Sequence, residues 1–193
     1  LVVDDEPDLC ELVEVTLKRK KYTVSAANSG EQALEMLENE TPDLVLLDVG
    51  LPGLTGWEVL KEMAGRSTIE KVPVAMFTGE KLTLTEILRK DIENLVGYIE
   101  KPFNSSDLLN TVEKILERTR RIYHIKEKIE NSPNGGEDLS RAFLAWNRTQ
   151  MIHERLLEKL KELRWEYVEE ERLARIDSLI EGEKQTIKES ELK

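Results

Sequence analysis

Several short apolar runs in this sequence end in a residue that could bind a phosphoryl group or a metal ion. Asp4 and Asp5 close the run at the start of the chain, and Asp48, Thr78 and Lys101 each close a later one. Because the carboxyl ends of parallel strands share one edge of a sheet, we expect these side chains to meet there. Two carboxylates for a hard cation, a carboxylate nucleophile, a hydroxyl and an ammonium group predict a phosphoryl-transfer site.

The expected role of each group follows from its chemistry. Mg²⁺ prefers oxygen ligands and keeps several waters, so Asp4 and Asp5 could supply one direct and one water-mediated contact. Asp48 would complete the carboxylate set and act as the nucleophile, forming an aspartyl phosphate. Lys101 could pair with a carboxylate and later with the phosphoryl group, and the Thr78 hydroxyl could donate to a phosphoryl oxygen. Catalysis would then consist mainly of positioning and charge stabilisation.

Each of these residues also has an ordinary structural explanation. An Asp or Thr after a strand is commonly a helix N-cap, and a Lys-Pro pair is commonly a turn. Taken singly, Asp5, Thr78 and Lys101 are therefore weak signals. Their occurrence together, at the ends of apolar runs in order along the chain, favours the functional interpretation.

The segments around these residues alternate in type, as in a parallel sheet built from βα units. Strands are predicted at residues 1–4, 22–27, 43–48, 72–77 and 97–100. Helix start signals follow three of them, at Pro7, at Ser29 and at Ser105. Five strands and five helices predict an α/β, flavodoxin-like doubly wound fold with a parallel sheet in the strand order 2-1-3-4-5.

Beyond residue 120 the pattern changes to helix alone. The last helix of the α/β unit continues towards Ile129, and turn-forming residues at 131–136 end it. Further on, apolar residues recur about every 3.5 positions, as in a coiled coil or a helical hairpin. They are Leu139, Phe143, Trp146, Ile152, Leu156, Leu160, Leu163 and Tyr167. We therefore predict an α/β domain at 1–120, a helix extension and linker at 121–137, and an all-α helical region at 138–193.

Charge and composition narrow the classes of function. The net charge is −11, and residues 1–119 hold 13 Lys and Arg against 23 Asp and Glu, an excess that would repel a nucleic-acid backbone. Residues 138–193 lack the short helices and basic recognition helix of a DNA-binding helix-turn-helix. Cys10, the one cysteine, excludes an internal disulfide and fits a small core residue. With no secretory signal and no apolar run of about 18 residues, we expect a soluble cytoplasmic protein that does not enter membranes.

Four segments carry a resemblance to a known family. They are LVVDDE at 1–6, LDVGLPGLTG at 47–56, FTG at 77–79 and EKPF at 100–103. Together they resemble the receiver domain of two-component response regulators, and the resemblance covers the chain from its start to residue 120. It implies that Asp48 is the phosphoacceptor. It also implies Mg²⁺ at Asp5 and Asp48, with Asp4 binding through water and Gly50 giving a backbone carbonyl.

The resemblance also implies a conformational switch. Tyr98 matches the family's aromatic switch position, and phosphorylation is expected to draw Thr78 towards Asp48 and let Tyr98 turn inward. The alternative for Tyr98 is a half-exposed strand tyrosine. A cis peptide is expected before Pro102, since such bonds are essentially confined to X-Pro. The family often carries a larger side chain where this chain has Gly50, so the lifetime of the phosphoryl group stays open.

The expected function is that of a signalling protein and not of an enzyme, apart from assisting its own phosphorylation and dephosphorylation. A sensor histidine kinase would phosphorylate Asp48 with Mg²⁺, and the C-terminal helices would bind a downstream protein or form a homodimer. One alternative is a phosphorelay intermediate, for which His153 beside Glu154 is a weak signal. Another is a transcription regulator with a divergent DNA-binding tail.

Overall fold

The computed structural model describes most of the α/β region and parts of the C-terminal region. The described residues are 1–69, 72–79, 95–132, 136–144, 146, 147, 150, 157, 161, 178, 181, 182 and 184. They fall into two compact units. The first contains the described residues up to Ile125, and the second contains those from Lys126 onward.

The first unit is built on a five-stranded parallel sheet in the order β2-β1-β3-β4-β5. Its strands are β1 (Val2–Val3), β2 (Ala26–Ala27), β3 (Val45–Asp48), β4 (Val74–Thr78) and β5 (Leu95–Glu100). The predicted fold and strand order are confirmed. The strand predicted at 22–27 is much shorter in the structure, because β2 lies at the edge of the sheet and pairs with β1 through two residues only.

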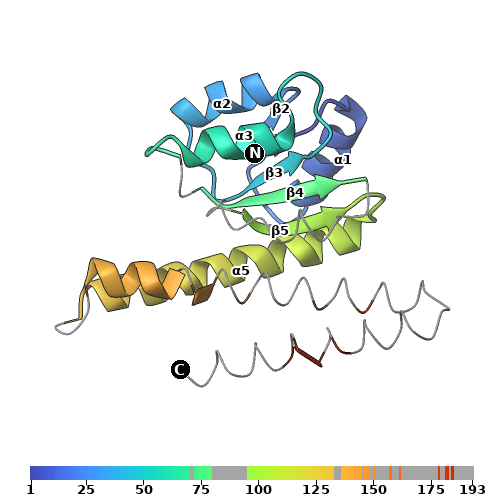
Figure 1. Cartoon of the computed structure of the whole chain (residues 1–193). Coiled ribbons are helices and arrows are strands. Elements are labelled where there is room, and N and C mark those ends of the chain that lie inside the picture. Colours follow the sequence, from blue (N-terminus) through green and yellow to red (C-terminus); the bar gives the residue numbers. More distant parts are fainter. Residues whose placement is uncertain are drawn as a thin grey trace. The chain divides into compact units, whose positions relative to one another are not determined.

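In the part of the chain that the structure describes, four helices cover the sheet, and their starts match local signals in the sequence. They are α1 (Pro7–Lys18), α2 (Gly30–Asn39), α3 (Gly56–Ala64) and α5 (Ser105–Glu130) (Figure 1). Pro7 is the first residue of α1, and the hydroxyl of Ser29 accepts the N–H of Gln32 at the start of α2. Thr55 and Glu58 form a capping box on α3. The remaining predicted helix, between β4 and β5, falls on residues outside those described.

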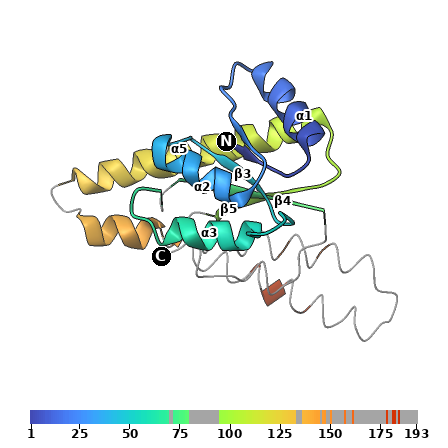
Figure 2. The same cartoon turned by 90° about the horizontal axis from the view of Figure 1, so that it is seen from above.

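The core has two layers, one on each face of the sheet. Helices α2 and α3 pack on one face, against side chains that include Val3, Leu47 and Met76. Helices α1 and α5 pack on the other face, against the neighbouring Val2, Leu46 and Ala75. Figures 1 and 2 show α2 and α3 on the opposite side of the strands from α5. Because both faces are covered, the strands are continuous apolar runs rather than alternating ones.

The end of α5 and the next helical segment meet in the second unit. The helix ends at Glu130, and Asn131 begins the turn that follows. Residues 137–144 are again helical. The buried Ser140 hydroxyl donates to Oε1 of Glu130 over 2.9 Å, and Lys126 forms an ion pair of 2.8 Å with the same carboxylate. This polar contact joins the two helical segments.

Only the start of the predicted C-terminal apolar stripe can be located. The Phe143 and Trp146 rings stack with their centroids 6.4 Å apart. Leu139 is 53% exposed and Trp146 41% exposed. The other members of the stripe (Ile152, Leu156, Leu160, Leu163 and Tyr167) and the His153-Glu154 pair lie outside the described residues. Among the helices that are described, none is both long and apolar enough to cross a membrane.

Candidate phosphoryl-transfer site

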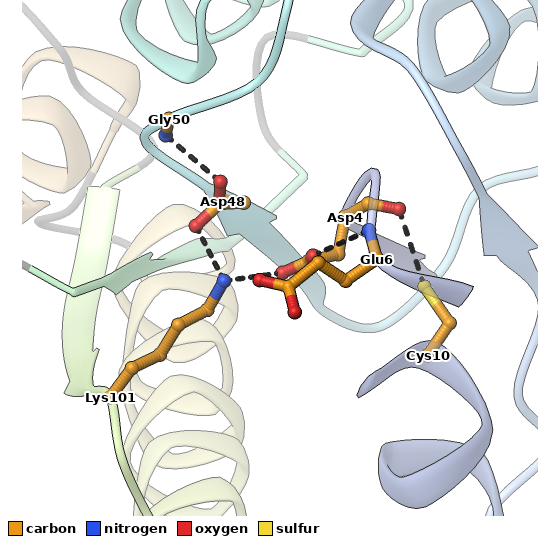
Figure 3. Close-up of polar contacts among 6 residues, drawn as sticks. All are labelled: Asp4, Glu6, Cys10, Asp48, Gly50 and Lys101. Atoms are coloured by element: carbon orange, nitrogen blue, oxygen red, sulfur yellow. Dashed lines mark hydrogen bonds and ion pairs between the residues drawn. The ribbon is translucent and has the colours of Figure 1, made fainter. Parts of the chain in front are cut away.

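The ammonium group of Lys101 lies between two carboxylates at the carboxyl edge of the sheet. Its Nζ is 2.7 Å from Oδ2 of Asp4 and 2.9 Å from Oδ1 of Asp48. The three residues follow or end β1, β3 and β5, so the parallel topology brings them together, as Figure 3 shows. The convergence predicted from the sequence for these three side chains is therefore present in the structure.

Backbone N–H groups hold the other oxygen of each carboxylate. The N–H of Gly50 donates to Oδ2 of Asp48 over 2.9 Å, and the N–H of Glu6 donates to Oδ1 of Asp4 over 3.1 Å (Figure 3). Each carboxylate is thus held at both oxygens, by Lys101 on one side and by its own loop on the other. Such contacts fix the orientation of a reacting group before any ligand arrives.

The site is largely buried, which strengthens the interactions between its charged groups. Asp4 is fully buried and Asp48 is 6% exposed. Burial acts to lower the pKa of Lys101, but hydrogen bonds to Asp4 and Asp48 and the charges of these two carboxylates outweigh it, so the pKa is raised. The lysine therefore stays positively charged at neutral pH, and its charge offsets part of the repulsion between the two acids.

Three carboxylates at this edge could hold a divalent cation. Ligand oxygens of Asp4, Asp5 and Asp48 all lie within 4.8 Å of one another, and Asp5 is exposed. Two oxygens on one Mg²⁺ are at most about 4.2 Å apart, so the three side chains fit this ion after a small adjustment. Oxygen-only donors of this kind suit Mg²⁺. The assignment of the Gly50 carbonyl to the ion stays a prediction.

Thr78 lies at the same edge of the sheet as the acids, whereas Tyr98 packs against the core. Thr78 is buried at the end of β4, and its carbonyl accepts the N–H of Lys101 over 2.7 Å. It therefore lies at the same edge of the sheet as the acids. Tyr98 is half-buried on β5 and packs against the core layer formed with α2 and α3. The switching roles of both residues stay predictions.

The contacts that Cys10 and Phe103 make at the site were not predicted from the sequence. The thiol of the buried Cys10, on the first turns of α1, donates to the backbone carbonyl of Asp4 over 3.5 Å. The Phe103 ring stacks on Phe77, with 5.2 Å between centroids, directly after the cis peptide expected before Pro102. Phe103 stands two residues after Lys101 in the sequence, and this position could have indicated that its ring lies near the site. Nothing in the sequence indicates the contact made by Cys10.

Residues 1–113 match the response regulator receiver domain family. The chain belongs to this family. Its relatives include the regulatory protein VanR of Enterococcus faecium, which is 34% identical over 131 residues. The match covers 68% of this chain and 55% of VanR, so this chain spans about half the length of that curated relative.

Solved structures show the same fold for the receiver domain. The chemotaxis response regulator CheY4 of Vibrio cholerae is 30% identical with a TM-score of 0.55, covering 59% of this chain and 94% of CheY4. The N-terminal domain of a response regulator receiver protein from Methanoculleus marisnigri is 35% identical with a TM-score of 0.50, covering 60% of this chain and 93% of that one. The family match ends at residue 113, so the C-terminal helices carry no family assignment.

Proposed function

We propose that Asp48 accepts a phosphoryl group from a sensor histidine kinase in a Mg²⁺-dependent reaction. The observation that carries the proposal is the Lys101 ammonium, held between Asp48 and Asp4 beside a three-carboxylate cluster. Receiver domains as a family are phosphorylated by histidine kinases. A carboxylate nucleophile, a fixed cation and an all-oxygen metal site are the parts this transfer needs.

In the proposed reaction an oxygen of Asp48 attacks the phosphorus atom of a phosphohistidine. The O–P bond forms as the N–P bond breaks, and the electron pair of that bond leaves with the imidazole. Lys101 and the Gly50 N–H hold the carboxylate in its orientation for attack. When bound, Mg²⁺ would supply positive charge against the repulsion between the carboxylate and the phosphoryl oxygens. Thr78 would donate its hydroxyl to one of those oxygens.

Phosphorylation would then bias the protein towards a second conformation. A new phosphoryl group carries a charge of about −1.5 to −2, enough to draw in the Thr78 hydroxyl. Thr78 is joined through its carbonyl to the backbone of Lys101, so its movement would reach β5 and Tyr98. Amide exchange over residues 79–103, of which 80–94 lie outside the described part, should change when beryllofluoride is added. Unchanged exchange would contradict the switch.

The phosphoacceptor assignment can be tested by intact mass. Incubation with a small acyl phosphate and Mg²⁺ should add one phosphoryl group to the parent and none to Asp48→Asn, and a chelator should prevent the addition. Asp43→Asn is the matched control, since Asp43 is exposed just before the same strand. Full labelling of Asp48→Asn, or labelling that survives removal of Mg²⁺, would rule out the assignment.

The C-terminal helices would serve as the output of the receiver domain, by binding a protein partner or a second copy of the chain. Leu139 and Trp146 support this, since both remain substantially exposed at the start of the apolar stripe. Leu156→Glu combined with Leu160→Glu should change the oligomeric mass or melt the helices while leaving Asp48 labelling intact. Identical mass by light scattering and identical helix content by circular dichroism would show that the stripe is not a packing seam.

A further inference from the structure

Gly56, the first residue of α3, lies directly against the backbone of Asp48. The loop between β3 and α3 folds back, so that its last residues lie beside its first ones. The N–H of Gly56 donates to the carbonyl of Val49 over 3.2 Å. A Cβ at position 56 would lie 2.0 Å from the carbonyl oxygen of Asp48 and 2.9 Å from its carbonyl carbon. Real Cβ atoms essentially never come within 3.0 Å of another heavy atom in this way. The position therefore has no space for a side chain.

Both sides of this contact are held by other parts of the domain. On the strand side, Asp48 is in register with Phe77, and the N–H of Val49 donates to the Phe77 carbonyl over 2.9 Å. On the helix side, Val59, Leu60 and Met63 of α3 are completely buried in the core. An added methyl group would thus have to displace either the end of β3, which carries Asp48, or a packed helix.

We propose that Gly56 is a positioning residue for the phosphoacceptor. Its missing side chain lets the first turn of α3 rest on the backbone of Asp48, and this contact fixes the carboxylate relative to Lys101 and the Asp4-Asp5 pair. The proposal rests on the proposed function of Asp48 and adds to it a requirement on a residue that does not touch the reacting atoms. Displacing a reacting group by about 1 Å can slow a reaction by about 100-fold.

Two other glycines provide matched controls. A Cβ at Gly30 would meet Cγ2 of Val59 at 2.5 Å and the carbonyl oxygen of Leu54 at 2.8 Å, so Gly30→Ala overpacks the same helix layer away from Asp48. Gly65 follows the other end of α3, and a Cβ there would meet nothing closer than 3.5 Å. Gly30→Ala therefore controls for lost stability, and Gly65→Ala controls for the substitution itself.

The test compares the parent with the three alanine variants of the whole chain. Two quantities are measured: the rate of phosphorylation by a small acyl phosphate and the affinity for Mg²⁺ alone. Both are corrected for the folded fraction of each variant, which circular dichroism gives. We expect Gly56→Ala to react about 10- to 100-fold more slowly than the parent and to bind Mg²⁺ more weakly. Gly30→Ala and Gly65→Ala should react at the parental rate, since neither touches Asp48.

Three outcomes would overturn the proposal. A parental rate and Mg²⁺ affinity for folded Gly56→Ala would overturn the proposal, as would an equal loss in Gly30→Ala. If Gly56→Ala does not fold, the measurements are repeated in trimethylamine oxide, which favours folding. A chain that stays unfolded there, while Gly30→Ala folds, would also overturn it, because Gly56 would then be needed for folding. A parent that is not labelled at all would instead refute the function proposed for Asp48.

Discussion

Lys101 and Asp4, which are 97 positions apart in the chain, form an ion pair of 2.7 Å at the edge of the sheet. Asp4 is fully buried, and its second oxygen accepts the N–H of Glu6. The same ammonium group lies 2.9 Å from Asp48 on the neighbouring strand. One cation thus connects the acids of two strands, so we expect that removing Lys101 would lower the stability of the receiver domain.

Lys101→Met should destabilise the protein in the absence of Mg²⁺. The substitution leaves two buried carboxylates facing each other without their shared cation, and because the lysine is 17% exposed we expect a loss of about 1–3 kcal/mol in the free energy of unfolding. Added Mg²⁺ should restore part of the loss. Urea unfolding with and without Mg²⁺ measures both effects, with Lys61→Met on the exposed side of α3 as control. Equal unfolding curves for Lys101→Met and the parent would contradict the structural role.

Asp5→Asn and Asp4→Asn should differ in their effect on stability. Asp5→Asn should weaken Mg²⁺ binding by about tenfold or more. Because Asp5 is exposed and one of three clustered negative charges is removed, the stability should be equal to that of the parent or higher. Asp4→Asn should lower stability as well, because Asp4 is the buried partner of Lys101. Calorimetric titration with MgCl₂ and thermal melts in chelator separate the two quantities. A larger stability loss for Asp5→Asn would refute this division of roles.

Cys10 should make the stability fall at alkaline pH. Burial raises the pKa of this thiol above its ordinary value of 9.0, with the charge of Asp4 acting in the same direction. The folded protein therefore holds the proton more tightly than the unfolded chain, so stability is complete below pH 9.0 and falls as the pH rises above it. Between pH 9.0 and pH 10.5, urea midpoints should show the decline in the parent and not in Cys10→Ala.

Lys101 provides an internal comparison for the same experiment. Its pKa is also raised, so it causes a loss of stability in the same direction, but only above its ordinary value of 10.5. As the pH rises, the urea midpoints of the parent and Cys10→Ala should therefore begin to change relative to each other at a lower pH than those of the parent and Lys101→Met. If the two differences develop over the same pH range, one of these assignments is wrong.

Ser140→Ala should weaken the C-terminal unit alone. The buried hydroxyl donates to Glu130, and its loss should cost about 1 kcal/mol in the unfolding of that unit. Ser106→Ala, on the exposed side of the first turn of α5, is the control. Helix content followed by circular dichroism during heating should show an earlier loss for Ser140→Ala, with Asp48 labelling at the parental rate. Loss of labelling in Ser140→Ala would instead show that Ser140 affects the receiver domain.

Much of the receiver domain could be predicted because its signals are local. The apolar runs before Asp48 and Thr78 indicate strands buried on both faces, and Pro7, Ser29 and Ser105 mark helix starts that the structure confirms. The convergence of Asp4, Asp48 and Lys101 follows from one topological rule, since parallel strands end at a common edge. No contact in space was needed to reach either conclusion.

The sequence by itself thus determined the order of strands, the residues at their ends and the chemistry that those residues could perform. Tertiary structure decided which atoms touch. The thiol of Cys10 on the Asp4 carbonyl, Phe103 on Phe77, and the absence of space at Gly56 all depend on how separate elements pack. Residue patterns report which face of an element is buried, with a resolution of one turn or one strand position. Hydrogen bonds and steric contacts are decided within a few tenths of an ångström, and only the packed core fixes distances that finely.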